Sequence, residues 1–296
     1  MIKPITRFLG LFLVSGFIFV SCTEQSITVP NEPTAEDIAA VQAAGFSIEG
    51  LYKSDDGSLW IENDINLTVS QLKTMKPGNV LEEQYSTDNL VNSGGARVIT
   101  VFMDDGSGSD GGGGGNGGGR GKPNKTSSAS FSSAYATALD EAISRFNAQN
   151  LELTFERVTS SAGADIVFTR LGKRDERRGV LGSAGFPTSS GDPYGEIKMS
   201  GILQSTYGLS TNGIATIMAH EMGHCIGFRH TDFFDRSISC GGSPSNEGTA
   251  GIGANHIQGT PTGADLQGNG SWMLACTDGS DRPFTNADKT ALDVLY

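Results

Sequence analysis

One stretch of eleven residues, HEMGHCIGFRH at positions 220–230, constrains this chain more than any other. The chain has only four histidines, and three of them lie in this stretch. Residues four apart share one face of a helix, so His220 and His224 can present two imidazoles to one metal ion. Glycine adopts the left-handed conformation at little cost and often ends helices, so Gly227 allows the chain to turn and bring in His230. The spacing therefore predicts a helix that ends beside a three-histidine metal site.

This ligand set is typical of catalytic zinc. Three protein ligands leave the fourth position open to water, whereas structural zinc sites use four protein ligands. Glu221 follows the first histidine and is the candidate general base for that water. Thr211 or Asn212 can cap the start of the helix, and four apolar residues inside it predict that the helix is buried. These residues are Ile214, Ile217, Met218 and Ile226.

The stretch resembles the signature of the metzincin zinc peptidases, and it is most similar to the bacterial dual-action HEIGH metallopeptidase family. Met222 stands where the family name has isoleucine, so one apolar residue replaces another. The resemblance implies an α/β (α+β) domain with a twisted mixed sheet, an active-site helix, a Met-turn and a C-terminal helix. Residues 270–273, Gly-Ser-Trp-Met, resemble that turn, in which Met273 would form an apolar floor beneath the histidines. Ala275 excludes the tyrosine that some metzincins carry two residues after the methionine.

The resemblance implies a zinc-dependent endopeptidase, whose partner is a protein or peptide substrate. His220, His224 and His230 would hold one Zn²⁺ ion. Glu221 would accept a proton from the attacking water and pass it to the leaving amine. Two other functions stay open. A zinc hydrolase of a non-peptide bond would keep the same residues, whereas a catalytically silent, surface-binding lipoprotein would have no need of Glu221.

The N-terminus predicts export from the cytoplasm. Lys3 and Arg7 precede an apolar run, residues 8–20, which is too short for a comfortable membrane span. The following Ser-Cys pair resembles a bacterial lipoprotein cleavage site. We therefore interpret residues 1–21 as a signal peptide and Cys22 as the lipidated first residue of an envelope lipoprotein, anchored to a membrane by that lipid. Secretion without a lipid is the alternative.

The charge of the chain argues against nucleic-acid partners. The formal net charge is −12, so no basic face is available to neutralise phosphates. We expect a monomer that does not bind nucleic acid. A structural Ca²⁺ ion would find hard oxygen ligands in Asp175, Glu176 or Asp192, but no calcium-loop motif supports that cofactor.

The cysteines predict one disulfide. If Cys22 carries lipid, three cysteines remain, and an oxidising compartment favours one bond among three pairings. We favour Cys240 with Cys276, because both are expected in irregular segments after the active helix. Cys225 would then be a small buried apolar residue.

The rest of the chain divides by composition. Residues 22–33 read as a tether, residues 34–94 as an accessory segment or propeptide, and residues 95–296 as the catalytic domain. An ordinary spacer is the alternative for 34–94. This segment has no cysteine after Cys22, so any latency must use a device other than a propeptide thiol. A glycine-rich tract, residues 106–121, predicts a flexible loop.

Periodicity predicts the main elements of the catalytic domain. A buried strand is expected at 97–103, an amphipathic helix at 128–148, and further strands at 151–158 and 164–171. The polar residues 172–194 suggest a solvated loop. By the resemblance, the strand at 195–200 would be the sheet edge beside the cleft, where an extended peptide can pair. We also expect short strands at 59–61 and 65–69, an irregular excursion at 231–270 and a final helix capped by Thr285.

Overall fold

The computed structural model describes residues 32–44, 46–62, 64–73, 84–106, 130–249, 251–261, 263–264, 266 and 268–296. All of them belong to one unit of the chain, Asn31–Tyr296. The expected signal peptide, Cys22, most of the tether and most of the glycine-rich tract lie outside the described residues. No helix within the described ranges is long and apolar enough to cross a membrane.

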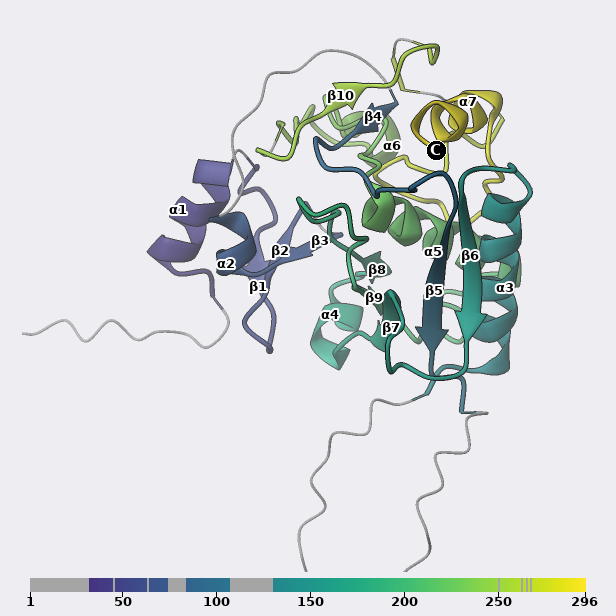
Figure 1. The fold of residues 1–296 in the computed structure, drawn as a ribbon. Coiled ribbons are helices and arrows are strands. Elements are labelled where there is room, and N and C mark those ends of the chain that lie inside the picture. The colour runs from purple at the N-terminus through teal and green to yellow at the C-terminus, as the bar shows by residue number, and fades with distance from the viewer. Residues whose placement is uncertain are drawn as a thin grey trace, which may run out of the picture. The chain divides into compact units, whose positions relative to one another are not determined.

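A five-stranded mixed sheet with the order β6-β5-β7-β9-β8 forms the centre of the fold (Figure 1). Its strands are β5 (Arg97–Met103), β6 (Leu153–Val158), β7 (Ile166–Arg170), β8 (Gly182–Ser183) and β9 (Glu196–Met199). Four strands are parallel, and β8 runs antiparallel to β9. The strand predicted at 195–200 is present as β9, but the prediction that it forms the edge of the sheet is wrong. Because β8 pairs with the outer side of β9, β8 forms the edge.

Two helices complete the main hydrophobic core. Helix α3 (Ser133–Asn147) packs against β6 and against α5 (Thr211–Ile226). Tyr135, Leu139 and Phe146 recur at helical spacing, and the side chains of all three are buried. The sequence predicts this helix correctly, because its apolar stripe is long and regular.

Helix α5 begins and ends at well-defined caps. The expected cap at Thr211 or Asn212 is wrong by one residue, because the Ser210 side chain accepts a hydrogen bond from the Gly213 N–H at 3.1 Å. Gly227 ends the helix in the left-handed conformation with φ 115°. From Gly213 to Ile226 every residue of the helix is buried, so it is a core helix as the sequence predicts.

The N-terminal segment, which we define as residues 34–73, has a small core of its own. It comprises α1 (Ala35–Ala44), β1 (Tyr52–Lys53), β2 (Leu59–Ile61), β3 (Ile65–Leu67) and α2 (Val69–Leu72). The three strands form an antiparallel sheet, β1-β2-β3. Its core includes Val41, Leu59 and Leu67, and Phe186, which lies outside this segment, joins them. Asp64, which precedes β3, lies next to α5, with its Oδ2 3.9 Å from Nε2 of His220.

Several shorter elements complete the fold. The charged run that suggested a solvated loop forms α4 (Lys173–Arg177), whose Asp175 and Glu176 are buried. Strand β4 (Tyr85–Ser86) pairs with β10 (Asn255–His256), and α6 (Ser237–Cys240) precedes β10. Helix α7 (Asn286–Leu295) starts with a capping box formed by Thr285 and Asp288.

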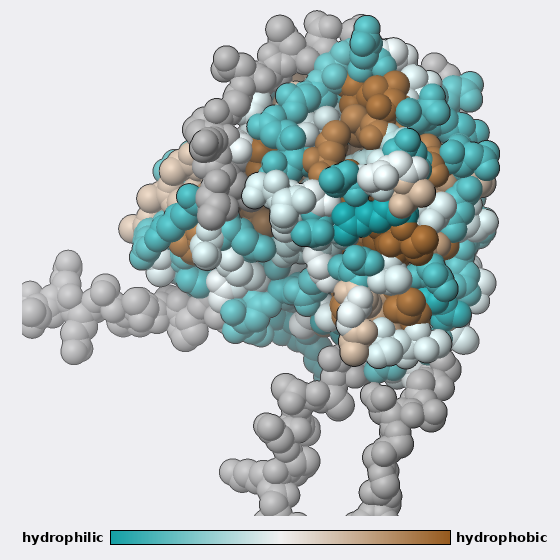
Figure 2. Space-filling view, in the orientation of Figure 1, coloured by the Kyte–Doolittle hydropathy of each residue, from teal (hydrophilic) through white to brown (hydrophobic). Residues whose placement is uncertain are grey.

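Apolar side chains that remain exposed are scattered over the surface. Figure 2 shows hydrophobic residues on this face as separate patches among hydrophilic ones. The large exposed apolar residues are Ile48, Val98, Tyr207, Ile238, Leu266 and Val294.

Candidate active site

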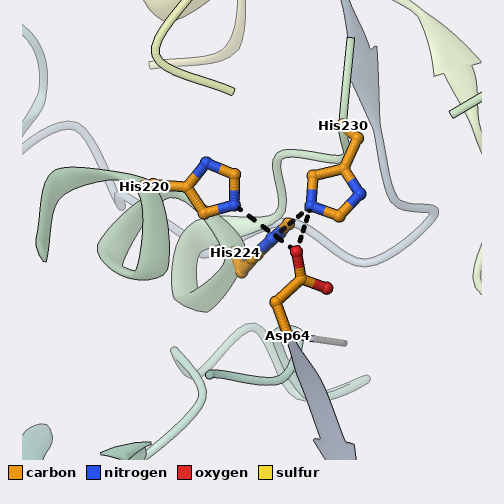
Figure 3. A group of neighbouring side chains, drawn as sticks. All are labelled: Asp64, His220, His224 and His230. Atoms are coloured by element: carbon orange, nitrogen blue, oxygen red, sulfur yellow. Dashed lines mark hydrogen bonds and ion pairs between the residues drawn. The ribbon is translucent and has the colours of Figure 1, made fainter. Parts of the chain in front are cut away.

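Three histidines converge at the C-terminal end of α5. His220 and His224 lie one turn apart on the helix, and the left-handed turn at Gly227 brings His230 back toward them. The Nε2 atoms of His224 and His230 are 3.2 Å apart. The His220 ring centroid lies 4.7 Å from that of His224 and 5.2 Å from that of His230. Figure 3 shows the three rings facing one another, so their nitrogens can reach a single ion.

The outer nitrogen of each ring is held by a hydrogen bond. Nδ1–H of His220 donates to the Trp272 carbonyl and that of His224 to the Phe228 carbonyl, each at 2.8 Å. Nδ1 of His230 lies 2.6 Å from Oε1 of Glu247. Such bonds orient the imidazoles and leave Nε2 for the metal.

Burial also keeps two of the three rings ready to bind a cation. Burial lowers the pKa of His220 to about 4, with the charge on His230 as a second cause. Burial likewise holds the pKa of His224 well below 6.5. For His230 burial acts in the same direction, but the carboxylates of Asp64 and Glu247 raise its pKa well above 6.5. His220 and His224 are therefore neutral, which is the form that coordinates metal.

Glu221 lies beside His220 in a confined space. The residue is 2% exposed, and its Oε2 has no hydrogen-bond partner. A Cβ added to Gly182 of β8 would lie 2.4 Å from Oε1 of Glu221, so only glycine fits under this carboxylate. Burial, and next the charge of Asp64, raise the pKa of Glu221 well above 4.5. A carboxyl group with a raised pKa can both accept and return a proton.

The turn that contains Trp272 and Met273 packs directly against α5. A Cβ at Gly223 would meet the Trp272 ring at 2.4 Å and Sδ of Met273 at 2.7 Å. The Met273 carbonyl accepts a hydrogen bond from the Thr231 N–H at 2.9 Å. Since Gly223 lies between His220 and His224 in the sequence of the helix, this turn packs against the part of α5 that carries the two histidines.

The structure adds a residue that the sequence reasoning missed, Asp64. It comes from the tip of the β2–β3 hairpin, and its Oδ2 lies 2.8 Å from Nε2 of His230 and 3.9 Å from Nε2 of His220. Asp64 and the three histidines form a buried group whose ligand atoms lie within 4.8 Å of one another (Figure 3). Three imidazoles and a carboxylate are a donor set that suits zinc. No sequence motif marks Asp64.

Glu247 is a second missed residue, and it is fully buried. It pairs with His230, with Arg236, and with Arg229 at 3.3 Å. Burial acts to raise the pKa of Glu247, but the charges of His230 and the two arginines lower it strongly. Glu247 is therefore an ionised carboxylate that holds His230 in place. It lies in a stretch that reads from sequence as irregular and polar.

A cavity of about 580 Å³ opens beside His220 and Glu221. Val180, Ile217 and Leu274 are among the residues that line it. A space of this size, largely apolar and adjacent to titratable groups, has the properties of a substrate pocket.

Among the described residues, the cysteines and the other histidine are not members of the group that could hold the metal. Cys240 and Cys276 are joined by a disulfide with Cα atoms 5.1 Å apart, and Cys225 is a buried free thiol. The remaining histidine, His256, lies in β10, where its Nε2 is 3.3 Å from Oγ1 of Thr260.

The three residues considered for calcium do not form a common site in the described part of the chain. Oδ2 of Asp175 accepts a hydrogen bond from Ser54 at 3.2 Å, and Oε1 of Glu176 accepts one from the Gly201 N–H at 2.8 Å. Asp192 pairs with Arg97. Each carboxylate is thus used by a different protein partner.

Comparison with known proteins agrees with this geometry. A family model described as dual-action HEIGH metallo-peptidase matches residues 121–296, which is more than half of the chain. The match includes the three histidines, Glu221 and Met273. A search of curated proteins found no match.

Proposed function

The chain belongs to the dual-action HEIGH metallopeptidase family, a group with a metzincin-like zinc peptidase fold, and from that premise we propose that it is a zinc-dependent endopeptidase. The observation that carries the proposal is the convergence of three buried imidazoles and Glu221 beside one cavity of about 580 Å³. The protein acts on peptide bonds as a metallopeptidase. We assign it to cleavage within protein chains, by the mechanism that follows.

His220, His224 and His230 would hold one Zn²⁺ ion through their Nε2 atoms. When bound there, the ion supplies a Lewis acid and lowers the pKa of water. The role of the histidine environment is to hold the ligands still. Glu247 and two backbone carbonyls fix the outer nitrogens, so the inner nitrogens face one point.

Glu221 would be the general base and then the general acid. Its carboxylate accepts a proton from the attacking water and returns that proton to the amine that leaves when the peptide bond breaks. Glycine at 182 lets β8 approach the carboxylate closely, because a side chain at this position would clash with Glu221. The cavity next to Glu221 would receive a side chain of the substrate.

The test is a Glu221→Gln variant, compared with a Glu141→Gln control on the surface of α3. Loss of the base should reduce cleavage of a casein-like protein by about 10²–10⁴-fold while bound zinc is retained. The control should cleave at the normal rate. Full activity in Glu221→Gln would contradict the assignment. Cleavage of small esters but not of proteins would favour a hydrolase of a non-peptide bond.

We further propose that the enzyme works outside the cytoplasm as a monomeric lipoprotein anchored through Cys22. The apolar N-terminal run supports export, and the Cys240–Cys276 disulfide is typical of an oxidising compartment. A Cys22→Ser variant should lose its lipid and move from the membrane fraction to the released fraction. Mass spectrometry of the mature N-terminus tests this directly, because an unmodified Cys22 in a membrane-free protein would contradict it.

A further inference from the structure

The Asp64 carboxylate lies where the ligands of the metal converge. Its Oδ2 is 2.8 Å from Nε2 of His230, the nitrogen that Glu247 does not use. Its other oxygen, Oδ1, is buried without a hydrogen-bond partner. A buried carboxylate that faces three imidazoles and lacks other partners is typical of a metal ligand rather than of a surface residue.

The backbone of the same hairpin forms hydrogen bonds with the edge of the five-stranded sheet. The Ala184 N–H donates to the Asp64 carbonyl, and the Asn66 N–H donates to the Ala184 carbonyl, both at 3.0 Å. Ile65 and Ala184 thereby form a parallel bridge just after β8. An extended peptide that adds to a sheet edge needs the same N–H and C=O groups. A peptide that paired with this edge at Ala184 would therefore have to displace the hairpin.

Side-chain contacts fix the hairpin in this position. Nζ of Lys198 in β9 donates to Oδ1 of Asn66 at 2.9 Å, and the Tyr194 hydroxyl donates to the Asn66 carbonyl at 3.1 Å. Glu62 at the hairpin tip is buried, 3.8 Å from the guanidinium of Arg229. Anchoring on β9 and on the signature stretch orients the tip toward the histidines.

The hairpin tip has a strained backbone. Glu62 has φ 56°, in the left-handed region that a residue with a side chain rarely adopts. Both oxygens of its carboxylate are buried without a hydrogen bond. Strain and unsatisfied polar atoms persist where the surrounding structure over-determines them, which is typical of functional sites. The tip is thus held against the metal site at a local free-energy cost.

We propose that Asp64 is a fourth ligand of the catalytic metal, and that the β2–β3 hairpin holds the peptidase in a closed, latent form. The inference rests on the proposed function, because it concerns how that site is regulated. Asp64 in the fourth position of the metal would exclude the attacking water. The hairpin backbone on the sheet edge would exclude an extended peptide. Withdrawal of the N-terminal segment frees both positions together.

The test uses the full-length protein with Co²⁺ in the metal site. Asp64→Ala removes the proposed ligand, and Glu36→Ala is the control, because Glu36 lies in α1 of the same segment, where it is exposed and pairs with Lys73. Asp64→Ala should change the visible absorption spectrum of the cobalt protein. It should also increase the affinity for acetohydroxamate, a metal-binding probe, by about tenfold or more, because the closed state no longer competes. The control should leave the spectrum and the affinity unchanged.

Several outcomes would overturn the proposal. An unchanged cobalt spectrum with unchanged hydroxamate affinity would show that Asp64 is not a ligand. Loss of the metal from Asp64→Ala would make Asp64 a permanent ligand rather than a reversible one. If that variant does not fold, Asp64→Asn keeps the size of the side chain and removes its charge, and the same two measurements apply. It should show a smaller change in the same direction.

Proteolysis separates this inference from the proposed function. Asp64→Ala should cleave a casein-like protein about tenfold faster or more than the unmodified chain. If the spectrum and hydroxamate affinity change but no protein is cleaved, the Asp64 ligand stands and the endopeptidase function fails. If the unmodified chain cleaves proteins and Asp64→Ala cleaves no faster, latency fails and the endopeptidase function stands.

Discussion

Helix α5 and the β2–β3 hairpin bring charged or metal-binding side chains to the same point by different means. The helix places its histidines through local geometry, since a spacing of four residues fixes their relation. The hairpin places Asp64 and Glu62 through contacts with Ala184, β9 and Arg229, which lie far along the chain. The comparison teaches that a signature identifies what holds a metal, whereas long-range packing decides what faces that metal from the other side.

The largest effect should follow from loss of a ligand on the helix side. His224→Ala removes a central imidazole, and we expect the variant to lose stoichiometric zinc and all proteolysis. His256→Ala is the control, because this histidine lies in β10 away from the metal group. Elemental analysis of the purified proteins measures the difference. Retention of one zinc ion by His224→Ala would contradict this prediction, because the other histidines and Asp64 would then hold the ion without His224.

A smaller effect is expected at the residue that orients His230. Glu247→Gln removes a charge that pairs with His230, Arg229 and Arg236. Replacement of such an outer partner typically weakens metal affinity by about 10–100-fold. Competition with a chromophoric chelator measures the affinity, and Glu141→Gln is again the control. Equal affinities would show that the helix geometry alone holds the third histidine.

Substitution of a glycine in each region should lower the unfolding free energy for a different reason. Gly223→Ala places a methyl group against Trp272 and Met273, and we expect a loss of about 1–3 kcal/mol in unfolding free energy together with weaker zinc binding. Gly57 in the N-terminal segment has φ +86° with open space around it, so Gly57→Ala should cost about 1–2 kcal/mol by backbone strain alone. Thermal denaturation measures both changes. If Gly57→Ala also weakened zinc binding, the two regions would be more tightly coupled than their packing indicates.

The smallest effect is a pH dependence within the N-terminal segment. Burial acts to raise the pKa of Asp37, but Lys53 and Thr34 outweigh it, so the pKa lies below its ordinary value of 3.8. A lowered pKa stabilises the fold above the unfolded value and loses that contribution as the pH falls through the folded value. Asp37→Asn should therefore be about 1 kcal/mol less stable at pH 7, because a capping carboxylate is lost. The difference should shrink below about pH 4. Denaturant titrations at several pH values measure it, and a constant difference would contradict the assignment.

The sequence predicts those parts of the molecule in which local spacing determines structure. The histidine spacing, the helix end at Gly227 and the apolar stripe of α3 all depend on neighbours within a few residues. The sequence fails where distant residues decide. Asp175 and Glu176 read as exposed charges, but both are buried, and their carboxylates accept hydrogen bonds from Ser54 and from the Gly201 N–H. The sequence does not predict the edge of the sheet for a similar reason. The two residues of β8 form a strand only because they pair with β9, and the sequence of neither strand reveals that pairing.

Asp64 and Glu247 illustrate the same limit within the site. Neither belongs to a motif, and each reaches the histidines from a segment that looks unremarkable in sequence. Glu247 lies in a glycine- and serine-rich stretch, and Asp64 follows a short strand of the N-terminal segment. Their positions depend on tertiary contacts that spacing rules do not contain. The absence of a cysteine from residues 34–94 predicts only that any latency uses a device other than a thiol.

One of the two tryptophans of the chain lies in the β2–β3 hairpin, and the other lies in the turn that packs against α5. Trp60 lies in β2, stacked on Tyr52, whereas Trp272 lies beneath the metal site, and both are buried. Replacing either one by phenylalanine leaves a single emitter that reports on one region. The emission maximum of Trp60 would shift to longer wavelength when the hairpin becomes exposed to solvent, while that of Trp272 would stay constant. The two single-tryptophan variants therefore show whether the N-terminal segment separates from the rest of the fold before the surroundings of Trp272 change.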